Sequence, residues 1–243
     1  MRIAVAGATG IVGTWIVREA QAAGHDVVPM SRAQGVDLVT GVGLHLDGVD
    51  VLIDASGPRT GSAAQARAFF AASTANLLRA GAASGVPHLV SLGIVGAAKA
   101  PYGYYAGKAL QEKLTTAGTI PWTLLRSTQF FEFAQKHVQR IGPWWGLPVM
   151  RSQPVAAASV ARRLVELAAE APQGRVLEIA GPERMSPADV LRARDRALGV
   201  RRRVIELRLP GGFARALRDG TILPGADAEI VGPRCAEWAS APA

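Results

Sequence analysis

The sequence of 243 residues has little of what disulfide-stabilised, metal-binding or membrane-spanning proteins need. Its single cysteine, Cys235, excludes an internal disulfide, and its four scattered histidines form no cluster with metal-ligand spacing. The longest uncharged stretch, residues 80–98, is interrupted by glycines, Pro87 and His88, so it is too polar to span a bilayer. We therefore expect no metal site and no membrane partner.

Acidic residues are also in the minority, with 19 Asp and Glu against 27 Lys and Arg, which gives a net charge of +8. Only four of the basic residues are lysines, and the arginines accompany abundant alanine and glycine, which is a feature of composition. The densest basic segment, residues 192–203, has no interleaved aromatic residues on which bases could stack. We interpret it as a solvated face and expect no nucleic acid partner.

No linker, repeat or low-complexity tract divides the chain, and its length suits one large domain. Arg2 and the apolar residues after it superficially resemble a signal peptide. The glycines and the charged helix that follow argue against that interpretation, so we expect a cytoplasmic protein.

Glycines are abundant, and three of them, Gly7, Gly10 and Gly13, lie between the apolar run 3–6 and a helical apolar stripe that closes at Gly24. A strand that breaks into glycines and continues as a helix leaves room for a diphosphate and presents backbone N–H groups to it. This context is typical of a dinucleotide-binding loop. The predicted cofactor-binding residues of the loop are Gly7, Thr9, Gly10, Ile11, Val12 and Gly13.

Strand and helix patterns alternate along the first two thirds of the chain. Strands are expected at residues 26–30, 36–39, 49–55, 88–92 and 122–126, and helices over 62–81 and 104–114. This order predicts an α/β fold, a Rossmann-type doubly wound parallel sheet.

The pattern changes after about residue 129, where aromatic residues gather before a helix at 159–169 and a strand at 176–180. Ser186 then caps a helix that has Pro187 at its first position and ends near Gly199. An alternating strand at 205–209, a short helix at 213–217 and a loose tail follow. We expect a single NAD(P)-binding domain over 1–243, with a small C-terminal α/β substrate lobe formed mainly by about 129–243.

Ligands of an open parallel sheet bind beyond the carboxyl ends of its strands. The strand at 26–30 is followed by Ser31 and Arg32, and the strand at 49–55 ends at Ala55 and Ser56. An arginine directly after the strand at 26–30 suits the extra phosphate of NADP, because its planar fork can hold phosphate bidentately. We predict that these four residues bind the cofactor and that the cofactor is NADP(H).

Tyr104 and Lys108 are spaced i, i+4, which places them on one face of the predicted helix. The lysine charge is expected to depress the pKa of the phenol and to make Tyr104 a better proton donor or acceptor. Ser91, at a strand end thirteen residues before Tyr104, offers a hydroxyl for a substrate carbonyl. We predict that these three residues are catalytic.

These residues carry a family resemblance. The glycine loop with Ser91, Tyr104 and Lys108 resembles the short-chain dehydrogenase/reductase superfamily. The sequence is more narrowly similar to the atypical NmrA-like branch of NAD(P)H-binding oxidoreductases, in the segments at 101–112, 121–130 and 180–183. The resemblance covers the chain to about residue 240.

The resemblance implies a hydride transfer. Lys108 would hold the nicotinamide ribose and aid Tyr104 as general acid, while Ser91 would orient the carbonyl and the nicotinamide would supply the hydride. One departure is Gly107, which replaces a better helix former at a local cost of about 1 kcal/mol.

Five aromatic residues of the C-terminal part are candidates for a substrate wall, because small-molecule pockets are largely apolar; they are Phe130, Phe131, Phe133, Trp144 and Trp145. The alternative is that they pack the lobe. Such a wall suits a flat hydrophobic carbonyl compound or a quinone.

The leading hypothesis is therefore an NADPH-dependent oxidoreductase that reduces a small hydrophobic carbonyl or quinone substrate. The alternative is a non-catalytic NADP(H)-binding redox sensor that acts on a protein partner, since the branch contains such members. A third hypothesis, an NAD-dependent sugar-nucleotide epimerase or dehydratase, is disfavoured by Arg32.

Overall fold

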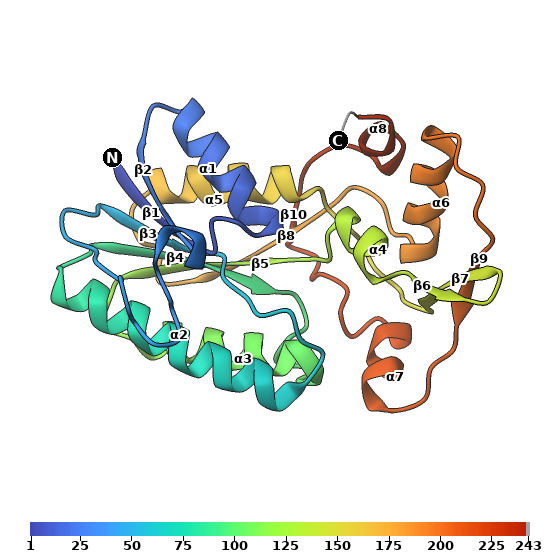
Figure 1. The fold of residues 1–243 in the computed structure, drawn as a ribbon, viewed down its shortest axis with the longest axis horizontal. Coiled ribbons are helices and arrows are strands. Elements are labelled where there is room, and N and C mark those ends of the chain that lie inside the picture. The colour runs from blue at the N-terminus through green and yellow to red at the C-terminus, as the bar shows by residue number, and fades with distance from the viewer. Residues whose placement is uncertain (242–243) are drawn as a thin grey trace. The chain divides into compact units, whose positions relative to one another are not determined.

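The structure, a computed structural model, describes residues 1–241 except for the side chains of residues 136 and 137. Figure 1 shows the order of its elements. They are β1 Arg2–Ala6, α1 Ile11–Ala22, β2 Asp26–Met30, the 3-10 helix η1 Arg32–Gln34, β3 Val51–Asp54, α2 Ala63–Ala83, β4 His88–Ile94, α3 Gly103–Ala117, β5 Trp122–Ser127, α4 Phe131–His137, β6 Gln139–Ile141, β7 Trp144–Pro148, α5 Ala157–Ala169, β8 Val176–Ala180, α6 Pro187–Ala197, β9 Val204–Leu207, α7 Gly212–Asp219, β10 Glu229–Ile230 and α8 Cys235–Ser240.

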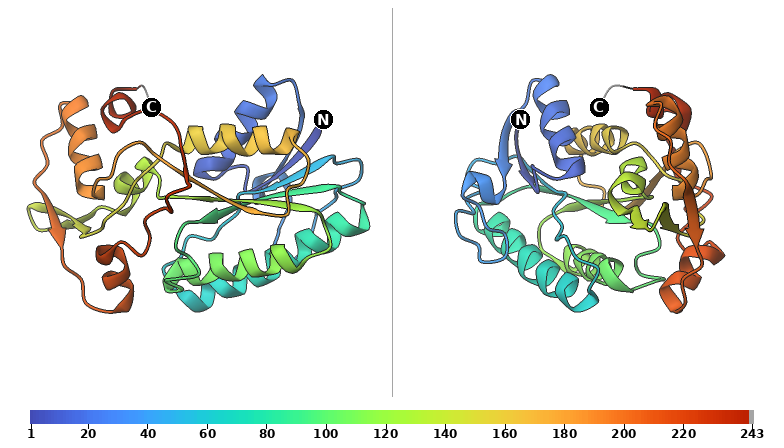
Figure 2. Two further views of the ribbon diagram at one scale, coloured as in Figure 1. Left: turned by 180° about the vertical axis from the view of Figure 1, so that it is seen from behind. Right: turned by 45° about the vertical axis from the view of Figure 1, so that its right-hand side comes forward.

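The central element is a parallel sheet of seven strands in the order β10-β8-β5-β4-β3-β1-β2. Helices α2 and α3 cover one face of this sheet, and α1 and α5 cover the other (Figures 1 and 2). The predicted doubly wound α/β fold is confirmed, and the strand predicted at 176–180 is found at those residues.

Two predictions about the segment after α1 had different outcomes. Strand β2 forms as predicted and contains Pro29, which is tolerated because β2 is the edge strand of the sheet. The strand predicted at 36–39 is wrong. The Asp37 carboxylate accepts the N–H of Val39 at 2.8 Å and that of Thr40 at 3.3 Å, so its side chain stabilises a turn there.

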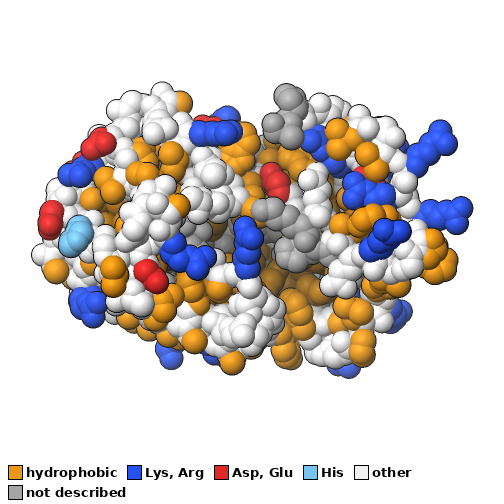
Figure 3. All heavy atoms as spheres, viewed as in Figure 1, with side chains coloured by type: hydrophobic (Ala, Val, Ile, Leu, Met, Phe, Trp, Pro, Cys, Tyr) orange, Lys and Arg blue, Asp and Glu red, His pale blue; other side chains and the backbone are white. Residues whose placement is uncertain are grey.

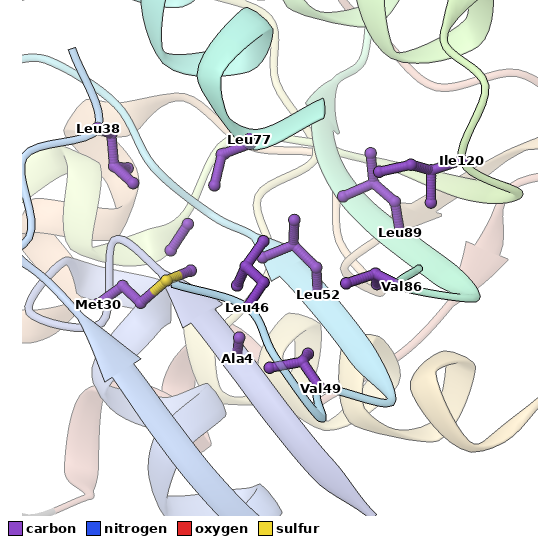
Figure 4. Packing of buried hydrophobic residues seen from close by; sticks show 11 residues of the cluster. Ala4, Met30, Leu38, Leu46, Val49, Leu52, Leu77, Val86, Leu89 and Ile120 are labelled. Atoms are coloured by element: carbon purple, nitrogen blue, oxygen red, sulfur yellow. The ribbon is translucent and has the colours of Figure 1, made fainter. Parts of the chain in front are cut away.

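The sheet packs on α2 through a cluster of buried apolar side chains (Figure 4). Leu77 of α2 lies on the side of the cluster opposite the strands that carry Leu52 and Leu89. The other buried members are Ala4, Ala6, Met30, Leu38, Leu46, Val49, Val86 and Ile120. Removing this apolar area from water, at roughly 25 cal/mol per Å², holds α2 on the sheet.

The packing of α3 on α2 explains why a residue of low helix propensity, Gly107, stands inside α3. A Cβ at this position of α3 would lie 2.6 Å from the Phe70 ring and 2.7 Å from the Ala66 carbonyl group, both on α2. Only a glycine lets the two helices approach this closely. The close approach places Phe70 beside the residues of α3 on either side of Gly107.

The chain divides into two compact units. The first unit contains Met1–Arg126 and Val160–Leu177, and the second contains Ser127–Ser159 and Glu178–Ala243. Whether they make one domain, as the sequence suggests, stays a prediction.

The second unit has its own three-stranded sheet, β6-β7-β9, in which β7 runs antiparallel to β6 and parallel to β9. Its core includes residues of α4, α6 and α8, and α6 packs against both of the other helices. The sequence patterns predicted β9 and α6, including the cap by Ser186, but not α4, β6 or β7. The expectation of a loose tail is wrong, because the tail forms β10 and α8.

The arginine-rich segment is only partly the solvated face that its composition suggested. Figure 3 shows basic side chains on the surface over α6 and the chain that leads to β9. Arg194, however, is only 9% exposed and donates hydrogen bonds to the carbonyl groups of Ala239 at 2.5 Å and Ala241 at 2.8 Å. Its guanidinium also lies over the Trp238 ring. Arg194 therefore anchors α8.

Within residues 1–241, no helix is both long and apolar enough to cross a membrane. Among the side chains that the structure describes, which leave out residues 136 and 137, no group of three or more His, Cys, Asp and Glu could hold a metal ion.

Candidate active site

The glycine loop closes tightly on the ends of β2 and β3. The N–H groups of Gly7 and Ala8 both donate to the Met30 carbonyl, at 3.1 and 3.3 Å. Gly7 has φ +81°, and a Cβ there would lie 2.8 Å from the Ala55 carbonyl oxygen and from Ser56 Cα. A glycine is required at this position for both its conformation and its contacts.

The N-terminus of α1 has neither a side-chain cap nor a negative charge in its first turn. Gly10 is the N-cap and provides no side-chain cap, and the first turn holds no acidic residue. A Cβ on Gly13 would overlap the Gly7 carbonyl, so the helix can start this close to the loop only with glycine there. The helix dipole and the first-turn N–H groups favour a bound phosphate at this point.

Ser31 and Arg32 lie directly after the edge strand β2. The buried Ser31 hydroxyl donates to the Gln34 side-chain oxygen. Arg32 begins the 3-10 helix with its side chain exposed. An exposed guanidinium at the end of this strand can bind a phosphate group.

Asp54 lies at the end of β3, and the sequence patterns did not predict it as a site residue. It is 2% exposed, and its Oδ1 accepts the N–H of Ser56 at 3.0 Å. Its Oδ2 accepts a hydrogen bond at 2.7 Å from the amide nitrogen of Gln111 on α3. The only sequence signal was an acidic residue at the end of an otherwise apolar strand. This carboxylate connects the segment beside the glycine loop to α3.

Lys108 lies one turn of α3 after Tyr104 and is 3% exposed. Its ammonium donates to the Leu92 carbonyl and, at 2.5 Å, to the Gln111 side-chain oxygen. It also lies over the Phe70 ring, 4.9 Å from the centroid. Burial lowers the pKa of Lys108 to about 8, against the opposing effect of the negative charges of Asp54 and Glu112.

The Tyr104 phenol packs against Gly57, since a Cβ at 57 would overlap the phenol oxygen. Its ring makes an edge contact with Phe70, with centroids 5.7 Å apart. The expectation that Lys108 depresses the pKa of Tyr104 is wrong, because burial and then the nearby Asp54 charge raise that pKa far above its usual value. Tyr104 is thus held in its protonated form.

Ser91 and Ser56 bring two hydroxyls to the same region. Ser91 on β4 pairs in register with Asp54 on β3, and it directly precedes Leu92, which binds the Lys108 ammonium. Ser91 is 1% exposed, and neither serine hydroxyl has a hydrogen-bond partner among the described residues. Buried hydroxyls of this kind are expected to bond to a ligand or to water.

The aromatic residues predicted to form a substrate wall all lie in the second unit and differ in their surroundings. Phe131 is fully buried in the core of that unit and stacks on Trp238, so we leave it out of the wall. Phe130 and Phe133 are half-buried, Trp144 is exposed, and Trp145 lies under the guanidinium of Arg202.

The structure therefore brings together most of the predicted site residues of the first unit. Gly7 contacts Ala55 and Ser56, Ser56 bonds to Asp54, Asp54 bonds to Gln111 and Gln111 bonds to Lys108. Tyr104 and Lys108 meet around the Phe70 ring. The glycine-lined anion site and the two unpartnered buried hydroxyls fit a dinucleotide.

Solved structures share this fold. UDP-glucose 4-epimerase from Bifidobacterium longum, in complex with NAD+ and UDP, matches with a TM-score of 0.72 at 13% identity, over 99% of this chain and 96% of that one. An NADPH-dependent quinone oxidoreductase (QOR2) from Escherichia coli matches with a TM-score of 0.59 at 20% identity, over 90% and 87%. A dTDP-4-dehydrorhamnose reductase from Clostridium acetobutylicum matches with 0.64 at 15%, over 85% and 84%.

No protein-family model matches the chain, and no curated protein matches it in sequence. The comparisons show that the chain has the Rossmann-type α/β fold of these solved structures.

Proposed function

We propose that this protein is an NADPH-dependent oxidoreductase that reduces a small hydrophobic carbonyl or quinone substrate, with Tyr104 as the proton donor. The observation that carries the proposal is the connected arrangement of glycine loop, Asp54, Lys108 and Tyr104 within one compact unit. The fold shared with an NADPH-dependent quinone oxidoreductase supports it.

The residues that would hold the cofactor follow from their chemistry. The loop from Gly7 to Gly13 and the first turn of α1 would bind the diphosphate, and Arg32 the extra phosphate of NADP. Ala55 and Ser56 border the loop, and Lys108 would bind the nicotinamide ribose. When bound, the reduced nicotinamide supplies a hydride.

The protein contributes a proton and an orientation. A substrate carbonyl that accepts a hydride becomes an alkoxide, which takes a proton from the nearest acid. Burial and Asp54 keep the Tyr104 phenol protonated at neutral pH, so it can donate that proton, and Ser91 can donate a hydrogen bond to the same oxygen. The aromatic residues Phe130, Phe133, Trp144 and Trp145 stay the candidates for the substrate wall.

The test titrates the protein with NADPH and NADH by tryptophan fluorescence, followed by a panel of carbonyl compounds and quinones in the presence of NADPH. We expect tighter binding of NADPH, and Arg32→Ala is expected to weaken NADPH binding at least about tenfold while NADH binding changes little. Tyr104→Phe is expected to reduce kcat by roughly 100-fold or more. Tyr102→Phe is the matched control, because Tyr102 is 47% exposed at the start of the same helix.

Full turnover by Tyr104→Phe on a confirmed substrate would show that the assigned acid is wrong. Binding of NADPH with no turnover on any member of the panel would favour the redox sensor instead.

A second candidate function follows from the match to UDP-glucose 4-epimerase over 99% of the chain. It is an NAD-dependent enzyme that acts on a sugar nucleotide. Tighter binding of NADH than of NADPH, together with saturable binding of UDP-glucose, would replace the reductase proposal with this one.

A further inference from the structure

The Lys108 ammonium is held by acceptors from two directions. An ammonium group has three N–H donors, and two of those of Lys108 are used by the Leu92 carbonyl and the Gln111 side-chain oxygen. One donor is left for a ligand or for Tyr104. Whatever fixes these two acceptors therefore fixes the direction in which the third N–H points.

The Leu92 carbonyl belongs to β4 and is fixed by the sheet, but the Gln111 side chain could rotate. Asp54 removes this freedom. Its carboxylate can only accept, so it binds the Gln111 amide nitrogen, at 2.7 Å, and turns the amide oxygen towards Lys108, which can only donate. All three side chains are buried, so water does not compete for these bonds.

We infer that Asp54 and Gln111 are positioning residues, which hold the Lys108 ammonium in the one orientation that leaves a single N–H for the cofactor ribose or for Tyr104. This inference rests on the proposed function for what the free N–H binds. The positioning itself is a property of the protein alone.

The groups that face Lys108 also determine its charge. Asp54 on β3 and Glu112 on α3 favour the ammonium, and burial opposes it; Glu112 is itself paired with Arg126. In Gln111→Met the ammonium loses an acceptor, and in Asp54→Asn it loses a nearby negative charge. Both substitutions are therefore expected to lower the pKa of Lys108 further.

The test uses the 243-residue chain with carbon-13-labelled lysine, because the sequence has only four lysines to assign. Loss of one signal in Lys108→Met identifies Lys108. We expect its titration to move down by roughly one pH unit in Gln111→Met and in Asp54→Asn. Thr115→Val is the matched control, a buried polar residue of the same helix, and is expected to leave the titration unchanged.

A second readout measures NADPH binding and, once a substrate is found, the pH profile of kcat. We expect the Kd for NADPH to rise about tenfold in Gln111→Met, and the acidic shift of Lys108 to reappear in the kcat profile. An unchanged Lys108 titration in either folded variant would overturn the inference. If the Lys108 titration shifts in the variants but the wild type neither binds NADPH nor turns over a substrate, the positioning role stands and the proposed function is rejected.

Discussion

Lys108→Met tests whether the buried ammonium opposes folding. The pKa of Lys108 is about 8 in the folded protein, against an ordinary value of 10.5. Since the unfolded chain binds more protons between these two values, the wild type gains stability as the pH rises through them. At about 1.4 kcal/mol for each pH unit, Lys108 destabilises the fold by about 3 kcal/mol at pH 7 and by about 1 kcal/mol at pH 10.

Methionine fills a similar volume without a charge, so the substitution removes this pH-dependent penalty. It also leaves the Leu92 carbonyl and the Gln111 oxygen without a donor, at a cost of about 1–3 kcal/mol for each that does not change with pH. The free energy of unfolding of Lys108→Met minus that of wild type is therefore expected to be about 2–3 kcal/mol higher at pH 7 than at pH 10. The loss of the two hydrogen bonds lowers this difference equally at both pH values.

The assay is urea unfolding of both proteins at several pH values from 7 to 10, followed by tryptophan fluorescence. Lys113→Met serves as the control, since it removes a surface lysine from the same helix. Tyr104 is common to all three proteins, so its titration cancels to first order. A Lys108→Met difference that stays flat from pH 7 to 10 would refute the buried, pKa-lowered ammonium.

Two further substitutions probe other contacts. Gly57→Ala places a methyl group on the Tyr104 phenol oxygen and is expected to lower kcat on the order of 100-fold by displacing the phenol, whereas Gly61→Ala, with open space around it, should keep activity. Steady-state kinetics with NADPH decide between these outcomes. Arg194→Met removes the donor to the carbonyl groups of Ala239 and Ala241, and about 2 kcal/mol of stability with it. Limited proteolysis should then cut the C-terminal helix faster than in wild type or in Arg196→Met, and equal cutting rates would contradict the anchoring role.

The hydrophobic pattern predicted most strands of the seven-stranded sheet. The strand at 176–180 and the edge strand with Pro29 form where short apolar runs predicted them. The strand predicted at 36–39 failed because one carboxylate, Asp37, offered the backbone a local alternative. The tail was missed because its order depends on Arg194, more than forty residues away, and a contact of that kind leaves no periodic signal.

The candidate site was predictable in its composition but not in its electrostatics. Spacing placed Tyr104 and Lys108 on one face of a helix, and both contact Phe70. The direction of the Tyr104 pKa could not be read from spacing, because it depends on burial and on Asp54, which arrives from another strand. Gln111 was missed for the same reason, since its role appears only when α3 packs beside β3.

The destabilisation by Lys108 bears on whether the site catalyses or only binds. The buried ammonium carries a pH-dependent cost that an uncharged side chain at 108 would not have, and perturbed buried groups gather at functional sites. A sensor would use that ammonium to hold a ribose, whereas the proposed reduction also uses the Tyr104 phenol as the proton donor. In Tyr104→Phe an enzyme should lose turnover and keep NADPH binding, whereas a sensor should keep both its binding and its response.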